Sequence, residues 1–140
     1  MTKQIFLNLA VADVEKSMRF YSQLGFTAND EFTSDNQKCM VWSEHIYVML
    51  QSQAMFRSYI KKAMPDSKQY QAASYTLPVE SLERVNEIVG NGLLAGGTEP
   101  MPLIDEGYMQ IRTIEDFDGH TWGIIFLNRE QFRASRASRP

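Results

Sequence analysis

The feature that most constrains the fold is an internal duplication of a pattern of one strand, one helix and three strands. The apolar segment IFLNLAVAD stops at Asp13, and a helix pattern and three short strand patterns follow. The same order returns where AASYTLPVES stops at Ser81. Aspartate and serine side chains accept hydrogen bonds from the first free amides of a helix, so both positions are expected helix caps. Aligning Val11 with Val79 brings the two caps into register, which indicates two βαβββ repeats.

One such repeat is too small to bury its own sheet, so the two are expected to pack together. The predicted fold class is α+β, with two βαβββ repeats that form a concave, barrel-like mixed sheet and place their helices outside. The expected organisation is a single domain over 1–128 and a basic tail over 129–140. Within the domain we expect repeat one over about 3–52, a connecting helix and linker over 53–71, and repeat two over about 72–128.

Composition and the N-terminus predict a cytoplasmic protein. The chain has 140 residues, of which 44% are hydrophobic, and no apolar run approaches the roughly 20 residues that cross a bilayer. The start MTKQIFLNLAVAD lacks the basic, hydrophobic and cleavage regions of a signal peptide. The single cysteine, Cys39, permits no internal disulfide and is expected to be a small buried side chain.

Charge is distributed unevenly along the chain. The net charge is −3, but the final stretch NREQFRASRASRP carries four arginines and one glutamate, so this stretch is +3 and the remainder is −6. A basic tail can meet anionic partners, although its small polar spacers and missing apolar periodicity favour a solvated or frayed end. The acidic remainder argues against nucleic acid as the main partner, and no membrane partner is expected.

Two motifs, LAVADVEKSMRFYSQLGF near the start and DFDGHTW near the end, give the chain a family resemblance. Together with the repeated βαβββ order, they resemble the vicinal oxygen chelate superfamily of glyoxalase I, bleomycin-resistance proteins, fosfomycin-resistance enzymes and extradiol dioxygenases. The resemblance covers roughly residues 3–128. It implies a paired βαβββ fold, commonly a homodimer, with a ligand site inside each curved sheet.

The resemblance also implies where metal ligands would lie in metal-dependent relatives. Carried over by position, these sites fall on Phe6 and Met49 in the first repeat and on Ser74 and Gly123 in the second. None is a normal ligand for a divalent ion, which takes carboxylate or imidazole donors. Gly123 interrupts a strand at the position where such relatives often place a glutamate. We therefore expect no metal site and no cofactor.

Neither histidine restores a metal site. His120 follows DFDG, and we expect it to have a turn and hydrogen-bonding role. His45 follows Glu44 directly in an extended segment, so the two side chains point to opposite faces and do not easily chelate one ion. No catalytic residue is assigned, and paired acids at strand ends are expected to be solvated turn residues.

A different kind of site is predicted on the concave face. Because strand side chains alternate, Asn8 shares a face with Phe6, and Thr76 shares a face with Ser74. The result would be a mainly apolar cavity with a few amide and hydroxyl groups, as in pockets for flat or aromatic molecules. Arg112 is expected to pair an anionic ligand bidentately. The predicted ligand-binding residues are Phe6, Asn8, Trp42, Met49, Ser74, Thr76, Tyr108, Arg112 and Gly123.

Three functions remain open from the sequence. The first is a metal-independent protein that binds a small hydrophobic or aromatic molecule, as a homodimer, similar to the bleomycin-resistance branch. The second is a metal-dependent glyoxalase-like lyase or isomerase, which would need ligands outside the four positions above. The third is a scaffold with a filled cavity that acts through protein contacts, or an enzyme of unrelated mechanism.

Overall fold

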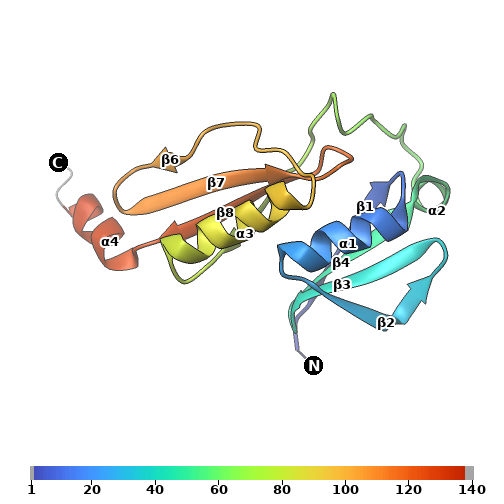
Figure 1. Cartoon of the computed structure of the whole chain (residues 1–140), viewed down its shortest axis with the longest axis horizontal. Coiled ribbons are helices and arrows are strands. Elements are labelled where there is room, and N and C mark those ends of the chain that lie inside the picture. The colour runs from blue at the N-terminus through green and yellow to red at the C-terminus, as the bar shows by residue number, and fades with distance from the viewer. Residues whose placement is uncertain (1, 138–140) are drawn as a thin grey trace.

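The duplication seen in the sequence is present in the structure, a computed structural model that describes residues 2–137 (Figure 1). The first repeat contains β1 (Ile5–Val11), α1 (Val14–Leu24), β2 (Thr27–Ser34), β3 (Gln37–Ser43) and β4 (Ile46–Ser52). A short helix, α2 (Gln53–Ser58), and a long linker follow. The second repeat contains β5 (Tyr75–Pro78), α3 (Leu82–Leu94), β6 (Ile104–Asp105), β7 (Met109–Glu115) and β8 (Thr121–Leu127), and α4 (Arg129–Ala137) ends the described chain.

Each repeat makes its own four-stranded mixed sheet. Sheet A has the strand order β1-β4-β3-β2, and sheet B has the equivalent order β5-β8-β7-β6. The first and last strands of each repeat pair in parallel, with Asn8 opposite Met49 in sheet A and Thr76 opposite Gly123 in sheet B. The expected α+β fold of two βαβββ repeats is confirmed. Within the chain, however, the sheets lie side by side and do not close into a barrel (Figure 1).

The two predicted caps start the two main helices. The side chain of Asp13 accepts a 3.1 Å hydrogen bond from the backbone N–H of Lys16, and the side chain of Ser81 accepts one of 3.0 Å from that of Arg84. Gly25 ends α1 with a φ of 130°, a backbone conformation that residues other than glycine rarely adopt. These local signals place both helices at equivalent points of the two repeats.

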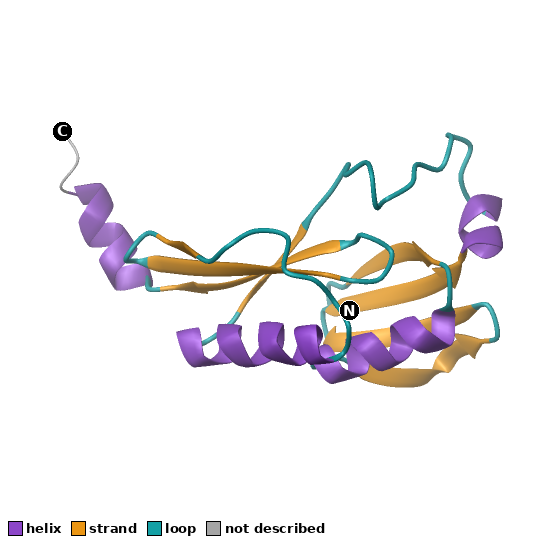
Figure 2. Ribbon diagram, turned by 45° about the horizontal axis from the view of Figure 1, so that its top comes forward, coloured by secondary structure: helices purple, strands orange, loops and turns teal. Residues whose placement is uncertain are grey.

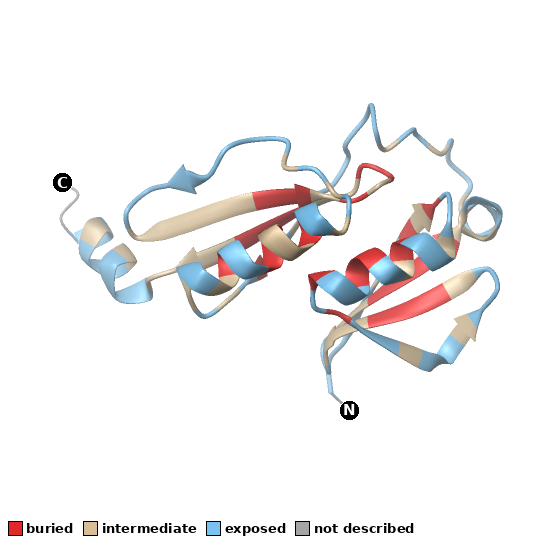
Figure 3. Ribbon diagram, in the orientation of Figure 1, coloured by how far each residue is buried: buried red, intermediate tan, exposed pale blue. Residues whose placement is uncertain are grey.

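The core lies between the sheets and the two helices, which cover the same side of the molecule (Figure 2). Buried positions gather along α1, α3 and the strands beneath them (Figure 3). Gly92 allows close contact here, because a Cβ at this position would lie 2.7 Å from Cγ1 of Ile114 and 3.0 Å from Cδ1 of Leu24. The largest fully buried side chains include Trp122, Tyr21, Phe20, Leu9, Leu24 and Met40. Cys39 is buried, as predicted.

A buried hydrogen-bond network fixes the hairpin 116–120 to the first repeat. Oδ1 of Asp116 accepts hydrogen bonds from the backbone N–H groups of Asp118, at 2.9 Å, and His120, at 2.8 Å. Its Oδ2 accepts one of 2.7 Å from the hydroxyl of Tyr21, which itself accepts one of 2.9 Å from the indole of Trp122. Burial, followed by the nearby Asp116 charge, raises the pKa of Tyr21 well above its ordinary value, so this hydroxyl stays protonated.

The same hairpin also reaches the first strand and the linker. The carboxylate of Asp118 accepts a 2.9 Å hydrogen bond from the backbone N–H of Ala12. Its carbonyl accepts one from the hydroxyl of Ser67. The ring Nε2 of His120 lies 2.8 Å from the carbonyl of Ala10. The hairpin therefore joins the first repeat, the linker and the second repeat.

Two elements differ from the sequence expectation. The first of the three strands expected after the helix of repeat two is reduced to β6 and a single bridge between Thr98 and Glu115, because Pro100 and Pro102 donate no backbone hydrogen bond. The connecting helix expected within 53–71 is α2, which stops at Ser58. The tail, expected to be solvated or frayed, forms α4, while 138–140 lie outside the described residues. No helix within residues 2–137 is long and apolar enough to cross a membrane.

Candidate functional site

Each sheet has one face that α1 and α3 leave uncovered, and on sheet A this uncovered face carries three predicted site residues. Phe6 stacks on Tyr47, with ring centroids 4.5 Å apart and an interplanar angle of 9°. Asn8 and Met49 are paired in register on the same face, where Asn8 is exposed and Met49 is buried. Phe6 is 42% exposed, so this face presents an aromatic surface to solvent. The structure thus brings Phe6, Asn8 and Met49 together.

The uncovered face of sheet B carries the equivalent residues of the second repeat. Ser74, Thr76 and Gly123 line a hollow of about 420 Å³, together with Gln71, Pro100, Met101, Ile111, Thr113, Glu115 and Thr121. The lining combines hydroxyl groups and apolar side chains with the amide of Gln71 and the carboxylate of Glu115. The two predicted halves of the site therefore lie on two different sheets, which do not face each other within one chain (Figure 2).

Gly123 is not required by an unusual backbone conformation. A Cβ at this position would lie 3.0 Å from Cδ1 of Ile111 and 3.4 Å from Oγ1 of Thr76. Its φ is outside the left-handed region, so a small side chain would require only that Ile111 shift by a few tenths of an ångström. The glycine leaves the floor of the sheet B hollow open between these two neighbours.

The four positions implied by the resemblance do not suit a metal ion. Phe6 and Met49 offer a phenyl ring and a thioether, while Ser74 and Gly123 offer a hydroxyl group and a hydrogen atom. Divalent ions of the hard or borderline kind need carboxylate or imidazole donors instead. In the part of the chain that the structure describes, no group of three or more His, Cys, Asp or Glu side chains could hold a metal.

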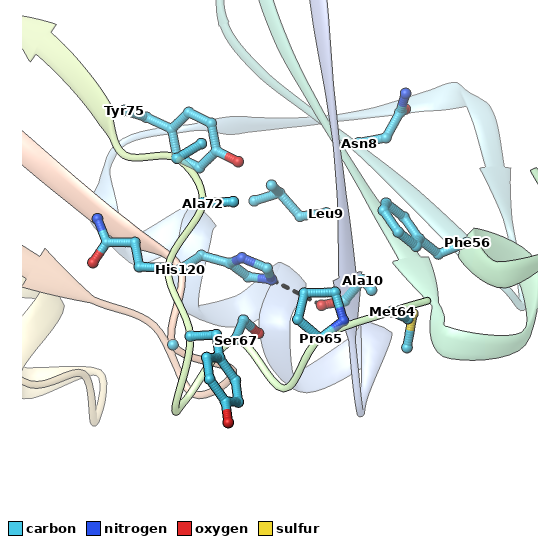
Figure 4. Close-up of a pocket in the computed structure, with 14 residues that line it drawn as sticks. Asn8, Leu9, Ala10, Phe56, Met64, Pro65, Ser67, Ala72, Tyr75 and His120 are labelled. Atoms are coloured by element: carbon cyan, nitrogen blue, oxygen red, sulfur yellow. Dashed lines mark hydrogen bonds between the residues drawn. The ribbon is translucent and has the colours of Figure 1, made fainter. Parts of the chain in front are cut away.

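A third hollow lies where β1 and β5 approach each other beneath the linker, and we name it the junction pocket (Figure 4). Its volume is about 200 Å³. It adjoins a hollow of about 390 Å³ that shares the side chains of Asn8, Phe56 and Tyr75. The junction pocket is lined by Asn8, Leu9, Ala10, Phe56, Met64, Pro65, Ser67, Tyr70, Gln71, Ala72, Ala73, Tyr75, Gly119 and His120.

His120 supplies an oriented polar group to the junction pocket. A carbonyl oxygen can only accept, so the 2.8 Å contact to Ala10 requires the proton to be on Nε2. In a neutral ring, Nδ1 is then left as a hydrogen-bond acceptor. The expected hydrogen-bonding role of His120 is confirmed, and its ring also forms part of the pocket wall (Figure 4).

Tyr75 supplies a second polar group. Its ring packs against Trp122 with centroids 4.9 Å apart, and within residues 2–137 its hydroxyl makes no hydrogen bond. Burial, followed by the negative charge of Asp116, raises the pKa of Tyr75. The hydroxyl is therefore protonated at neutral pH and is available as a donor.

Three predicted site residues lie away from the uncovered faces. Trp42 packs into the core on the helix-covered side, with its ring 5.1 Å from that of Phe26. Arg112 is also on that side, since it bonds Asn86 of α3 at 3.1 Å. Tyr108 lies at the far end of sheet B, where its ring is 5.2 Å from that of Phe132.

Arg112 is already engaged in an ion pair within the chain. Its Nε and Nη2 donate bidentate hydrogen bonds of 2.8 and 2.7 Å to the carboxylate of Glu99. These hydrogen bonds lower the pKa of Glu99 and keep its carboxylate ionised. The guanidinium therefore acts as an internal ion-pair partner on the helix-covered side of sheet B, and it does not point toward the sheet B hollow.

The junction pocket was not predicted from the sequence. Most of its wall comes from the linker, including Met64, Pro65 and Tyr70, and from Phe56 of α2. The available signal was length: the segment between α2 and β5 is long and contains no regular element. Loops of this size inside a domain are often functional.

Comparisons with known proteins agree with this architecture. Residues 3–42 match a family model described as bleomycin resistance protein-like N-terminal. The hypothetical protein SA1046 from S. aureus has a similar structure, with a TM-score of 0.76 and 24% identity over 90% of this chain and 95% of that chain. A glyoxalase-related enzyme from Fulvimarina pelagi has a TM-score of 0.75 and 19% identity, over 90% and 88%. No curated protein sequence matches the chain significantly.

A glyoxalase/bleomycin resistance protein/dioxygenase family enzyme from Burkholderia phytofirmans PsJN is also similar in structure. Its TM-score is 0.71 at 13% identity, over 90% of this chain and 99% of that chain. The fold is thus that of the glyoxalase/bleomycin-resistance class. The motifs LAVADVEKSMRFYSQLGF and DFDGHTW indicated a resemblance to the vicinal oxygen chelate superfamily. The family-model match over residues 3–42 and the similar solved structures confirm this resemblance.

Proposed function

We propose that the chain binds a small molecule with a single aromatic ring and a hydroxyl group, without a metal ion, in the junction pocket. The observation that carries this proposal is a pair of oriented polar groups in a wall that is mainly apolar but also contains the side chains of Asn8, Ser67, Tyr70 and Gln71. The hydroxyl of Tyr75 makes no hydrogen bond within residues 2–137, and Nδ1 of His120 is an acceptor. Ligand pockets characteristically combine apolar surface with a few such groups.

The two polar groups have complementary requirements. Tyr75 donates, so it needs an acceptor on the ligand, while Nδ1 of His120 needs a donor. A phenolic hydroxyl can meet both needs with one oxygen. The volume of about 200 Å³ is below the roughly 300–1,000 Å³ of sites for drug-sized ligands, so it favours a single ring, with larger substituents in the adjoining hollow.

The side chains at the four superfamily positions also favour binding without metal. None of the four supplies a carboxylate or an imidazole, which a glyoxalase-like lyase or isomerase would need for its ion. Residues 3–42 also match the family model described as bleomycin resistance protein-like N-terminal. Sequestration of a ligand therefore fits this chain better than metal-assisted catalysis does.

The test is calorimetric titration of chelator-treated protein with phenol and with anisole. Anisole has the same ring and oxygen but no proton to donate, so it should bind more weakly than phenol. Tyr75→Phe should weaken phenol binding by about 2–12-fold, the effect of one hydrogen bond. Tyr108→Phe, the same chemical change outside the pocket, should leave the affinity unchanged.

Two results would contradict the proposal. One is the absence of phenol binding up to millimolar concentration. The other is binding or lyase activity that appears only when nickel, zinc or manganese is added, which would favour the metal-dependent enzyme instead.

A further inference from the structure

The last helix is an unpartnered element of the fold. α4 starts at the cap Asn128, whose side chain accepts a 3.0 Å hydrogen bond from the backbone N–H of Gln131. None of its residues is buried. The helix projects beyond the end of sheet B (Figures 1 and 2). The ring of Phe132 there lies 5.2 Å from that of Tyr108. Intrinsic helix stability at this length is marginal, so an isolated helix of nine residues gains from a packing partner.

One face of α4 carries three arginines, which we name the arginine face. Arg129, Arg133 and Arg136 follow the i, i+4, i+7 spacing of a single helix face, and all three are exposed. With Leu127 and Phe132 they line an open groove of about 510 Å³. Within residues 2–137, none of the three forms an ion pair. The face therefore offers positive charge around an apolar floor.

A surface of opposite charge lies on β2 and the turn that follows it. Asp30, Glu31 and Asp35 are exposed, and within residues 2–137 none of them has an ion-pair partner. Phe32 lies among them and is 46% exposed. β2 is the outer strand of sheet A, and its pairing with β3 is irregular between Asn29 and Ser34. We name this surface the acidic edge.

The arginine face and the acidic edge cannot meet within one chain. α4 lies at one end of the long axis of the molecule, and β2 belongs to the repeat at the other end (Figure 1). Two copies related by a two-fold axis across the long axis would run in opposite directions. Each copy would then place its α4 beside the β2 of the other, so both contacts would form together.

We propose that the arginine face of α4 docks on the acidic edge of a second copy of this chain. Charge complementarity sets the orientation, and the exposed ring of Phe32 and the half-buried ring of Phe132 supply apolar area between the charges. Nucleic acid fits less well, because the chain outside the tail has a net charge of −6. The contact is independent of any ligand in the junction pocket.

The first measurement is sedimentation equilibrium of the full chain at 50 and 500 mM NaCl. The wild type should be a dimer, with a dissociation constant that rises at the higher salt concentration because exposed charges are screened. Reversing the charge of the arginine face with Arg133→Glu and Arg136→Glu should raise the dissociation constant of the dimer at least about tenfold, since like charges then face each other. Reversing the edge with Asp30→Lys and Glu31→Lys should have the same effect.

The decisive experiment mixes the variant with the reversed arginine face and the variant with the reversed acidic edge. The first variant has two acidic surfaces and the second has two basic surfaces, so neither should pair with itself. An equimolar mixture should restore dimers at near wild-type affinity, because both contacts regain opposite charges. Glu83→Lys with Glu87→Lys, on the exposed side of α3, is the matched control and should leave self-association of the wild type unchanged.

Several results would overturn the proposal. These are a monomeric wild type at 100 µM in low salt, a dimer that either reversal leaves intact, and a mixture that fails to recover dimers. Loss of heparin or phosphate binding in the arginine variant without any change in dimerisation would assign the face to a free anion instead. Circular dichroism of each variant checks that its fold is intact.

Discussion

The hydroxyl of Tyr21 donates a 2.7 Å hydrogen bond to Oδ2 of Asp116, although the two residues are 95 positions apart in the sequence. Tyr21 is fully buried on α1, and Asp116 begins the hairpin of the second repeat. The bond therefore joins the two repeats directly. It also fixes the hairpin that carries His120 into the junction pocket.

Tyr21→Phe should destabilise the fold by about 1–3 kcal/mol, because it removes a donor from a buried carboxylate and an acceptor from the indole of Trp122. Urea unfolding followed by circular dichroism measures this change. Tyr47→Phe is the matched control, since its hydroxyl bonds only the exposed side chain of Gln4. Equal stability of the two variants would show that the buried bond contributes nothing.

Asp116 predicts a specific dependence of stability on pH. Burial, the largest influence, raises the pKa of this carboxyl above the ordinary value of about 3.8, although the nearby His120 and three hydrogen bonds oppose the shift. A group with a raised pKa in the folded state favours folding below its unfolded pKa, and this contribution is lost as pH rises through the folded pKa.

The measurement compares the unfolding free energies of the wild type and Asp116→Asn between pH 3.5 and 7. Subtracting the two curves cancels titrations that both proteins share, including that of Glu99. The wild-type value should fall relative to the variant as pH rises above about 3.8. A difference that stays constant, or that changes in the opposite direction, would contradict the raised pKa.

Gly119 should be sensitive to substitution because of its contact with the linker. Its φ is 90°, and a Cβ there would collide with the backbone carbonyl of Ser67. Gly107 has a similar φ of 81°, but a Cβ there would have no neighbouring atom within 4 Å. Gly107→Ala therefore measures the backbone strain alone.

Gly119→Ala should therefore lose more stability than Gly107→Ala, by about 1 kcal/mol or more. It should also expose residues 60–74 to limited proteolysis, because the linker must move away from the hairpin. Equal cleavage rates in the two variants would show that the contact between hairpin and linker does not hold the pocket wall.

Arg112→Met should leave phenol affinity unchanged, since its guanidinium bonds Glu99 and Asn86 on the helix-covered side. The variant should lose about 1–2 kcal/mol of stability, because the carboxylate of Glu99, whose side chain is 22% exposed, loses a bidentate partner. A large loss of phenol binding with unchanged stability would return Arg112 to the ligand site.

The order of elements could be read from the sequence because each signal for it is local. Asp13 and Ser81 mark helix starts in both repeats, and Gly25 marks a helix end. The helix over 129–137 was not predicted, because Phe132 is its only large apolar residue and no apolar stripe identifies it. A strand at Pro100 and Pro102 was predicted from apolar character alone, although two missing donors weaken the ladder.

The site was only partly predictable for a geometric reason. Alternation along a strand shows which side chains share a face, but it does not say which face of a sheet the helices cover. Arg112 shares its face with the buried Ile114, and Trp42 shares its face with the buried Met40. The junction pocket depends on the path of the linker, which no periodic pattern encodes.

The most direct test of the account is a ¹H–¹⁵N correlation spectrum of chelator-treated protein during titration with phenol. We predict saturable shifts at Tyr75, His120 and the linker over 64–73, with little change at Thr113 on the face of the sheet B hollow, and smaller shifts in Tyr75→Phe. An unchanged spectrum at millimolar phenol, or shifts confined to the sheet B hollow, would contradict binding in the junction pocket.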